Sequence, residues 1–153
     1  MDGLVARAMA KWPDVPAVYG WLELDRRGQW RIKGERIAHG GLREFIARSY
    51  QSDERGRWYF QNGPQRVFVT LAYTPLVVHH EGETLIDQCG RRVVASAAYL
   101  DDEGSVLIQG GFAIALLDDR DLERYVELAE RLPRVTRAEV ERRFGFVREP
   151  GPA

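Results

Sequence analysis

Residues able to bind metal or act as nucleophiles are concentrated in the middle of the sequence. His79-His80-Glu81-x-Glu83 is followed closely by Asp87 and Cys89. Adjacent side chains of a strand point to opposite faces, so His79 and His80 cannot easily hold one ion. The spacing also matches neither a zinc ribbon nor a His-Glu-x-x-His helix. We therefore interpret this segment as a solvated turn and expect neither a metal ion nor a cofactor.

The thiol of Cys89 is the strongest nucleophile that the chain offers, because a histidine beside a thiol can activate it. Cys89 precedes Gly90 in an expected loop, and no local motif supports activation. A lone thiol usually packs as a small apolar group. An enzyme of unrecognised type that uses Cys89 with His79 or His80 therefore stays an alternative, and we favour a protein without catalysis.

Three aspartates could be interpreted as carboxylates for acid–base chemistry, but their spacing suggests turns. Asp25, Asp53 and Asp101 each open an Asp-x-x-Gly segment, and a strand with a large apolar residue follows each glycine. Asp at the first position and Gly at the fourth are the preferences of a type I turn. Turn formation explains these aspartates completely.

One β-hairpin is predicted between Asp53 and Leu71. Gly63-Pro64 suits a two-residue loop, because glycine accepts the positive φ of its first position. That loop sets Asn62 opposite Gln65, Phe60 opposite Val67 and Trp58 opposite Val69. Alternation then places an apolar set on one face, and a one-residue slip would turn that set outward. The set is Trp58, Phe60, Val67, Val69 and Leu71.

The other face of this hairpin is the candidate binding surface. It carries Arg57, Tyr59, Gln61 and Arg66, with Phe68 among them. Such side chains can stack on and hydrogen-bond a planar anionic ligand, a nucleotide or an acidic peptide of a partner. Single-stranded nucleic acid is a further alternative. If a helix instead covers this face, the site does not exist.

The remaining pattern predicts strands and three helices. Alternation favours strands near residues 18–24, 29–33, 92–100, 105–109 and 112–116. Apolar spacing predicts helices from Leu42 to Tyr50 and over 118–132. A further helix should begin after Thr136, where Glu139 completes a capping box, and end at Gly145.

The expected fold is α+β, with mostly antiparallel sheet and helices packed on one side. Two related hairpin-plus-helix units are predicted near residues 18–50 and 92–131, with the hairpin of residues 53–71 connecting them. Residues 1–17 should form an N-terminal arm, residues 18–146 one compact domain, and residues 147–153 a flexible tail.

Composition is that of a globular protein: 44% of the 153 residues are hydrophobic and 29% are charged. No apolar run reaches the roughly 20 residues of a membrane span. The absence of a secretory signal and the lone cysteine suggest the cytoplasm.

The charge is unevenly distributed along the sequence. Residues 1–70 carry a net charge of +4 (12 basic, 8 acidic) and residues 71–153 one of −5 (10 basic, 15 acidic). The net charge of −1 disfavours nucleic acid as the partner, and the opposite charges would permit oligomers.

The layout resembles a proteobacterial family of uncharacterised proteins catalogued as a domain of unknown function. The resemblance rests on GQWRIKG, on GRWYFQNGPQRV and on IQGG before a helix, and covers roughly residues 12–131. It implies repeated β-hairpin-plus-helix units and a role in signalling or regulation. It implies no catalytic residue. A small molecule or a partner protein is therefore the expected binding partner.

Overall fold

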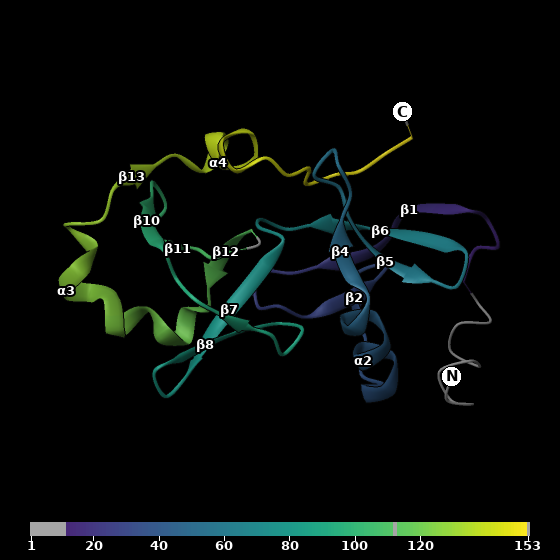
Figure 1. Cartoon of the computed structure of the whole chain (residues 1–153), viewed down its shortest axis with the longest axis horizontal. Helices are drawn as coiled ribbons and strands as arrows, with labels where there is room; N and C mark the ends of the chain where they lie inside the picture. The colour runs from purple at the N-terminus through teal and green to yellow at the C-terminus, as the bar shows by residue number, and fades with distance from the viewer. Residues whose placement is uncertain (1–11, 112, 153) are drawn as a thin grey trace.

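The computed structural model describes residues 12–111 and 113–152, and two β-sheets follow one another along the chain (Figure 1). The first sheet contains β1 (Ala17–Leu24), β2 (Trp30–Ile32), β3 (Glu35–Arg36), β4 (Tyr50–Ser52), β5 (Trp58–Asn62) and β6 (Gln65–Leu71). Their spatial order is β3-β2-β1-β6-β5-β4, and helix α2 (Gly40–Arg48) connects β3 to β4.

The second sheet has seven strands in the order β13-β10-β11-β12-β7-β8-β9. They are β7 (Leu76–Glu81), β8 (Thr84–Asp87), β9 (Arg92–Val93), β10 (Ala97–Asp101), β11 (Val106–Gln109), β12 (Ile114–Leu117) and β13 (Arg134–Val135). A 3-10 helix η1 (Asp119–Tyr125) and a short helix α3 (Val126–Ala129) lie between β12 and β13, and α4 (Arg137–Phe144) follows.

The fold is α+β, and both sheets are mixed rather than purely antiparallel. Most neighbouring strands are antiparallel, but β1 pairs in parallel with β6, β7 with β12, and β10 with β13. In the first sheet, β1 to β3 run outward from the centre, and β6 returns to lie beside β1. In the second sheet, β7 to β9 run outward in the same way, and β12 returns to lie beside β7. The hairpin β5–β6 belongs to the first sheet. The units proposed at residues 18–50 and 92–131 do not coincide with the sheets, and their relationship stays a prediction.

The hairpin register agrees with the predicted one. Asn62 pairs with Gln65 and Phe60 with Val67, and Gly63 has a φ of 55°. The apolar face is buried throughout, with Phe60 at 0% exposure. Trp12 and Phe45 of α2 pack edge-on against the Phe60 ring. This face is therefore the core of the first sheet.

The helices only partly match the expectations. The α4 helix begins with the predicted Thr136–Glu139 capping box and ends at Gly145 with a φ of 71°. The helix expected over residues 118–132 is instead the 3-10 helix η1 followed by the four-residue α3, and none of their residues is buried. The helices also lie at different sides of the sheets, with α2 and α4 at opposite edges in Figure 1, so they do not share one side.

The segment after α4 crosses back to the first sheet, as the yellow trace in Figure 1 shows. The Val147 amide donates to the Gly56 carbonyl at 2.9 Å, and the Leu71 amide donates to the Arg148 carbonyl at 2.8 Å. Residues 147 and 148, placed by prediction in a flexible tail, thus join the two halves of the molecule.

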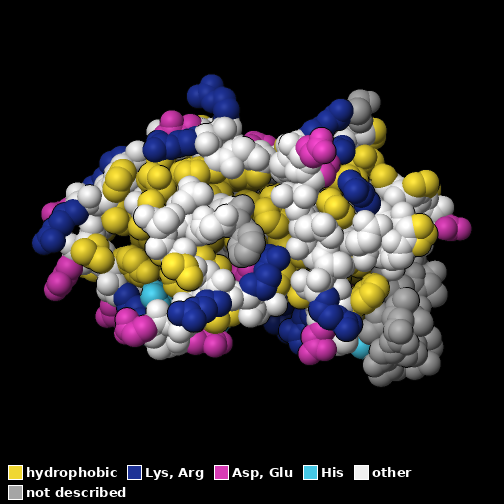
Figure 2. Space-filling model, viewed as in Figure 1, with side chains coloured by type: hydrophobic (Ala, Val, Ile, Leu, Met, Phe, Trp, Pro, Cys, Tyr) yellow, Lys and Arg dark blue, Asp and Glu magenta, His cyan; other side chains and the backbone are white. Residues whose placement is uncertain are grey.

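Charges of both signs are interspersed over both halves of the face shown in Figure 2. The charge asymmetry of the sequence therefore does not produce a surface of one sign on this side. Within the described residues, no helix has the length and apolarity needed to cross a bilayer.

Candidate functional site

The rings on the candidate face of the hairpin are covered by neighbouring side chains. Tyr19 of β1 stacks on Phe68, with centroids 4.9 Å apart and planes 5° from parallel. The Arg57 guanidinium lies 4.7 Å from the Phe68 centroid, and that of Arg66 lies 4.5 Å from the Tyr59 centroid. Tyr59 and Phe68 are consequently buried although they point away from the core.

Arg57 is held in place by the preceding turn. Its Nε donates to Asp53 Oδ2 at 2.8 Å, and its backbone amide donates to Asp53 Oδ1 at 3.0 Å. Partial burial by itself would raise the pKa of the Asp53 carboxyl. The two hydrogen bonds from Arg57, a third from the Arg55 amide and the positive charge of Arg57 together bring that pKa below its usual value. Arg57 is therefore already paired.

Gln61 does not present its amide to the candidate face. Its Nε2 donates to the carbonyls of Gly63 at 2.7 Å and Gln65 at 3.2 Å, across the hairpin loop. Arg66 differs from the other members because it is exposed, and no described carboxylate lies within ion-pair distance of it. Of the four predicted residues, Arg66 is thus the one that is exposed.

A hollow of about 580 Å³ opens over this face. The predicted residues Arg57, Tyr59 and Arg66 line it, together with residues that the sequence reasoning missed: Tyr19, Ser52, Asp53, Glu54 and Arg55. Alternation along residues 18–24 predicts the strand face on which Tyr19 lies. It does not predict that this strand pairs in parallel with β6, which is what brings Tyr19 beside Phe68. We call Arg66, Tyr59, Arg57, Tyr19 and Arg55 the Arg66 face.

The histidines and the cysteine do not form one site. His79 Nε2 lies 3.2 Å from Glu81 Oε1, whereas His80 Nε2 lies 2.8 Å from the Tyr125 hydroxyl. Within the described residues, neither histidine forms a hydrogen bond with Cys89, and burial raises the pKa of that thiol to about 12. Among the described residues, no three His, Cys, Asp or Glu side chains gather to hold a metal ion.

The aspartates of the Asp-x-x-Gly turns act as predicted, and the described chain contains a fourth such turn at Asp87–Gly90. In every case Oδ1 accepts the amides two and four residues later, and the glycine φ lies between 77° and 83°. In three turns Oδ2 pairs with an arginine Nε at 2.8–2.9 Å: Asp25 with Arg31, Asp53 with Arg57, and Asp87 with Arg91. These carboxylates are structural.

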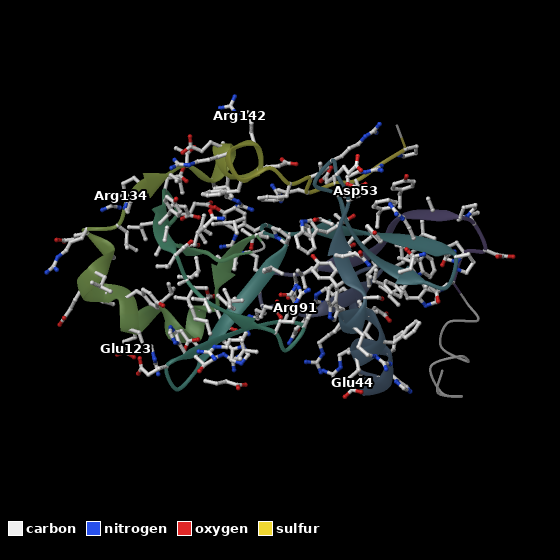
Figure 3. The ribbon with its side chains drawn as sticks, viewed as in Figure 1. Glu44, Asp53, Arg91, Glu123, Arg134 and Arg142 are labelled. Atoms are coloured by element: carbon white, nitrogen blue, oxygen red, sulfur yellow. The ribbon has the colours of Figure 1, made fainter. Side chains whose placement is uncertain are left out.

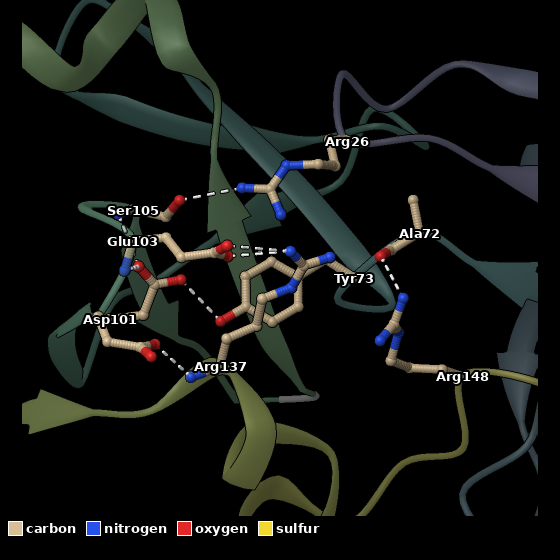
Figure 4. Close-up of polar contacts among 9 residues, drawn as sticks. Arg26, Ala72, Tyr73, Asp101, Glu103, Ser105, Arg137 and Arg148 are labelled. Atoms are coloured by element: carbon tan, nitrogen blue, oxygen red, sulfur yellow. Dashed lines mark hydrogen bonds and ion pairs between the residues drawn. The ribbon is translucent and has the colours of Figure 1, made fainter.

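The fourth carboxylate, Asp101, takes part in a polar cluster between the sheets (Figure 4). Its Oδ2 accepts a hydrogen bond from the Tyr73 hydroxyl at 2.8 Å. The guanidiniums of Arg26 and Arg137 lie 5.0 and 5.3 Å from the Tyr73 centroid. Arg148 Nη2 donates to the Ala72 carbonyl at 2.7 Å. Burial and the Asp101 charge raise the Tyr73 pKa well above its ordinary value, so the cluster keeps the phenol neutral.

Comparisons with known proteins identify relatives but no activity. A family model described as "Protein of unknown function (DUF2946)" matches residues 1–151. A DUF1285 family protein from Silicibacter pomeroyi DSS-3 is similar in structure, with a TM-score of 0.56 and 20% identity over 84% of this chain and 85% of that one.

A second DUF1285 family protein, from Shewanella baltica OS155, gives a TM-score of 0.54 and 14% identity over 70% of this chain and 91% of that one. At these identities the similarity concerns the fold alone. No curated protein matches the chain.

Proposed function

The chain belongs to the DUF2946 family of proteins of unknown function, and on that premise we propose that it is a non-enzymatic binding module. Its site is the Arg66 face, and its ligand carries a carboxylate or a phosphate. The ligand is a small anion or an acidic segment of a partner protein. We further propose that this binding serves regulation in the cytoplasm, and the resemblance of the sequence to proteins with a suggested signalling role supports this proposal.

The exposed guanidinium of Arg66 on the Tyr59 ring carries the proposal. The guanidinium carbon lies over the Tyr59 ring, and no carboxylate of the described residues pairs with the N–H donors of Arg66. A planar fork of donors pairs with carboxylate or phosphate in two parallel hydrogen bonds. The ring beneath restricts the side chain, so less rotamer freedom is lost when a ligand binds.

Neighbouring groups make the Arg66 face suited to a single phosphate or carboxylate group of a ligand rather than to the extended backbone of a nucleic acid. Arg55 is exposed and adds a second cation, whereas Asp53 neutralises Arg57 and Glu54 is exposed beside them. Single-stranded nucleic acid would need a continuous basic groove with exposed rings, and Tyr59 and Phe68 are buried. Nucleic acid is thus the less supported partner.

An enzyme is also the less supported function. Within the described chain, Cys89 lacks a histidine partner, and a thiol with a pKa of about 12 is protonated at neutral pH. Because the thiolate is the nucleophile, such a group is unreactive.

The test is binding of three probes to the full chain: ATP, a hexaglutamate peptide and a thymidine oligonucleotide. Fluorescence anisotropy with labelled peptide or oligonucleotide and calorimetry with ATP give the affinities. We expect Arg66→Gln to weaken binding of ATP or of the peptide about tenfold, since a charge-assisted hydrogen bond contributes about 1.5–3 kcal/mol.

Arg142→Gln is the matched control, because Arg142 is exposed on α4 and points away from the molecule at the top of Figure 3. Equal weakening by both substitutions would contradict the proposal, as would the absence of binding by ATP and by the peptide. Binding of the oligonucleotide alone, with a steep loss on adding salt, would favour nucleic acid instead.

A further inference from the structure

A second cavity, of about 350 Å³, lies where the two sheets meet. The β1–β2 turn, β2 and α2 of the first sheet form most of its wall, and Gln88 and Cys89 of the β8–β9 turn close it from the second sheet. This volume is at the small end of the range found for small-molecule sites, which occur preferentially between domains.

Close packing of the two sheets fixes the wall of this cavity. A Cβ added to Gly28 would lie 3.2 Å from the Gln88 Cβ and 3.3 Å from the Val77 Cβ. The Gln88 side chain is engaged at both ends: Oε1 accepts the Val77 amide at 2.9 Å, and Nε2 donates to the Pro75 carbonyl at 2.9 Å. The Gln88 side chain therefore lines the cavity, but its amide is already hydrogen-bonded and does not bind a ligand.

The lining of the cavity combines buried apolar side chains with exposed cationic ones. Trp30 and Ile37 are 3% and 7% exposed, and the protonated Cys89 thiol adds a further uncharged surface. Arg36 on the edge strand β3 and Arg43 on α2 line the cavity and are exposed. Within the described residues, neither has a carboxylate at ion-pair distance.

We propose that this cavity binds a small monocarboxylate with a flat apolar body. The carboxylate pairs with the guanidiniums of Arg36 and Arg43, whose donor geometry matches it. The apolar body enters over Trp30 and Ile37, where its removal from water stabilises the complex. Glu44 also lines the cavity, and its charge disfavours a doubly charged phosphate relative to a monocarboxylate.

Titration of the full, isotopically labelled chain with benzoate, followed by amide NMR shifts, tests this site. We expect saturable shifts of the Gly28, Gly40 and Cys89 amides, with a Kd of about 1 mM or tighter. Arg43→Gln should weaken this binding about tenfold through loss of a charge-assisted hydrogen bond. Arg36→Gln should act in the same direction.

Arg48→Gln is the matched control, because Arg48 is exposed in the last turn of the same helix and does not line the cavity. Shifts that do not saturate, or equal weakening by Arg43→Gln and Arg48→Gln, would overturn the proposal. Tighter binding of inorganic phosphate than of benzoate would overturn the ligand class. The Gly28, Gly40 and Cys89 amides report on this cavity, whereas binding of ATP and of the peptide reports on the Arg66 face, so this inference and the proposed function fail independently.

Discussion

The Tyr73 hydroxyl donates to Asp101 Oδ2 at 2.8 Å, in the position that an arginine Nε takes at the other Asp-x-x-Gly turns of the described chain. Tyr73 lies in the segment between β6 and β7, whereas Asp101 begins the β10–β11 turn. Both residues are 2% exposed. In the other turns the aspartate pairs with an arginine four or six residues later. In the β10–β11 turn, Asp101 instead bonds Tyr73 and so holds the second sheet against the segment that joins the sheets.

Tyr73→Phe is expected to lower the free energy of unfolding by about 1–3 kcal/mol, because it leaves a buried carboxylate oxygen without its donor. Urea denaturation measures the change. Tyr99→Phe is the control, since Tyr99 is only half-buried and contacts Phe144 through its ring. It should change stability by less than about 0.5 kcal/mol. Equal losses would show that the hydrogen bond to Asp101 adds no stability.

Gly56→Ala should destabilise the protein more than Gly104→Ala. Both glycines end an Asp-x-x-Gly turn, with φ values of 79° and 83°, so both alanines suffer the same backbone penalty of about 1–2 kcal/mol. A Cβ at Gly56 would also lie 2.2 Å from the Gly145 carbonyl oxygen, whereas one at Gly104 meets nothing within 4 Å.

The added cost at Gly56 arises because the segment after α4 must move away from the β4–β5 turn. Hydrogen exchange of the Val147 amide, which donates to Gly56, should therefore accelerate in Gly56→Ala and not in Gly104→Ala. Equal exchange rates in the two variants would contradict this docking.

Stability should fall at alkaline pH, partly through Cys89. Burial raises the pKa of its thiol from 9.0 to about 12, so the folded state retains a proton that the unfolded state releases. The corresponding stabilisation is complete below pH 9 and is lost as the pH rises from 9 to 12. Urea denaturation of Cys89→Ser across this window should show a shallower decline than the unsubstituted chain. Parallel declines would exclude this contribution.

The arm formed by η1 and α3 should open independently of the rest of the protein. None of its residues is buried, and it is held by Asp121, which accepts the His80 amide at 2.8 Å, and by Tyr125, whose hydroxyl meets His80 Nε2. His80→Gln is expected to accelerate tryptic cleavage at Arg120, Arg124 and Arg131. His79→Gln is the adjacent control, because His79 contacts the exposed Glu81. Similar cleavage rates would contradict the role of His80.

Sequence pattern was reliable where neighbouring residues decide the structure. The Gly63-Pro64 loop, the Thr136–Glu139 capping box and the Asp turns all depend on hydrogen bonds within a few residues. The helix over residues 118–132 failed for the opposite reason. Val126 and Leu128 in its middle are 66% and 46% exposed, so this segment buries too little apolar surface to support a long α-helix.

The sequence by itself determined the hairpin, its register and which of its faces enters the core, because alternation leaves one arrangement that buries the apolar set. It also grouped Arg57, Tyr59 and Arg66 on the other face. Only the tertiary structure decided their surroundings: Tyr19 of β1 stacks on the adjacent Phe68, Tyr59 is buried, and Arg66 remains exposed on Tyr59. Likewise, the parallel pairing of β1 with β6 and the cavity between the sheets depend on segments distant in sequence. Local periodicity shows which face of a strand is buried, but it does not specify which distant segments pair.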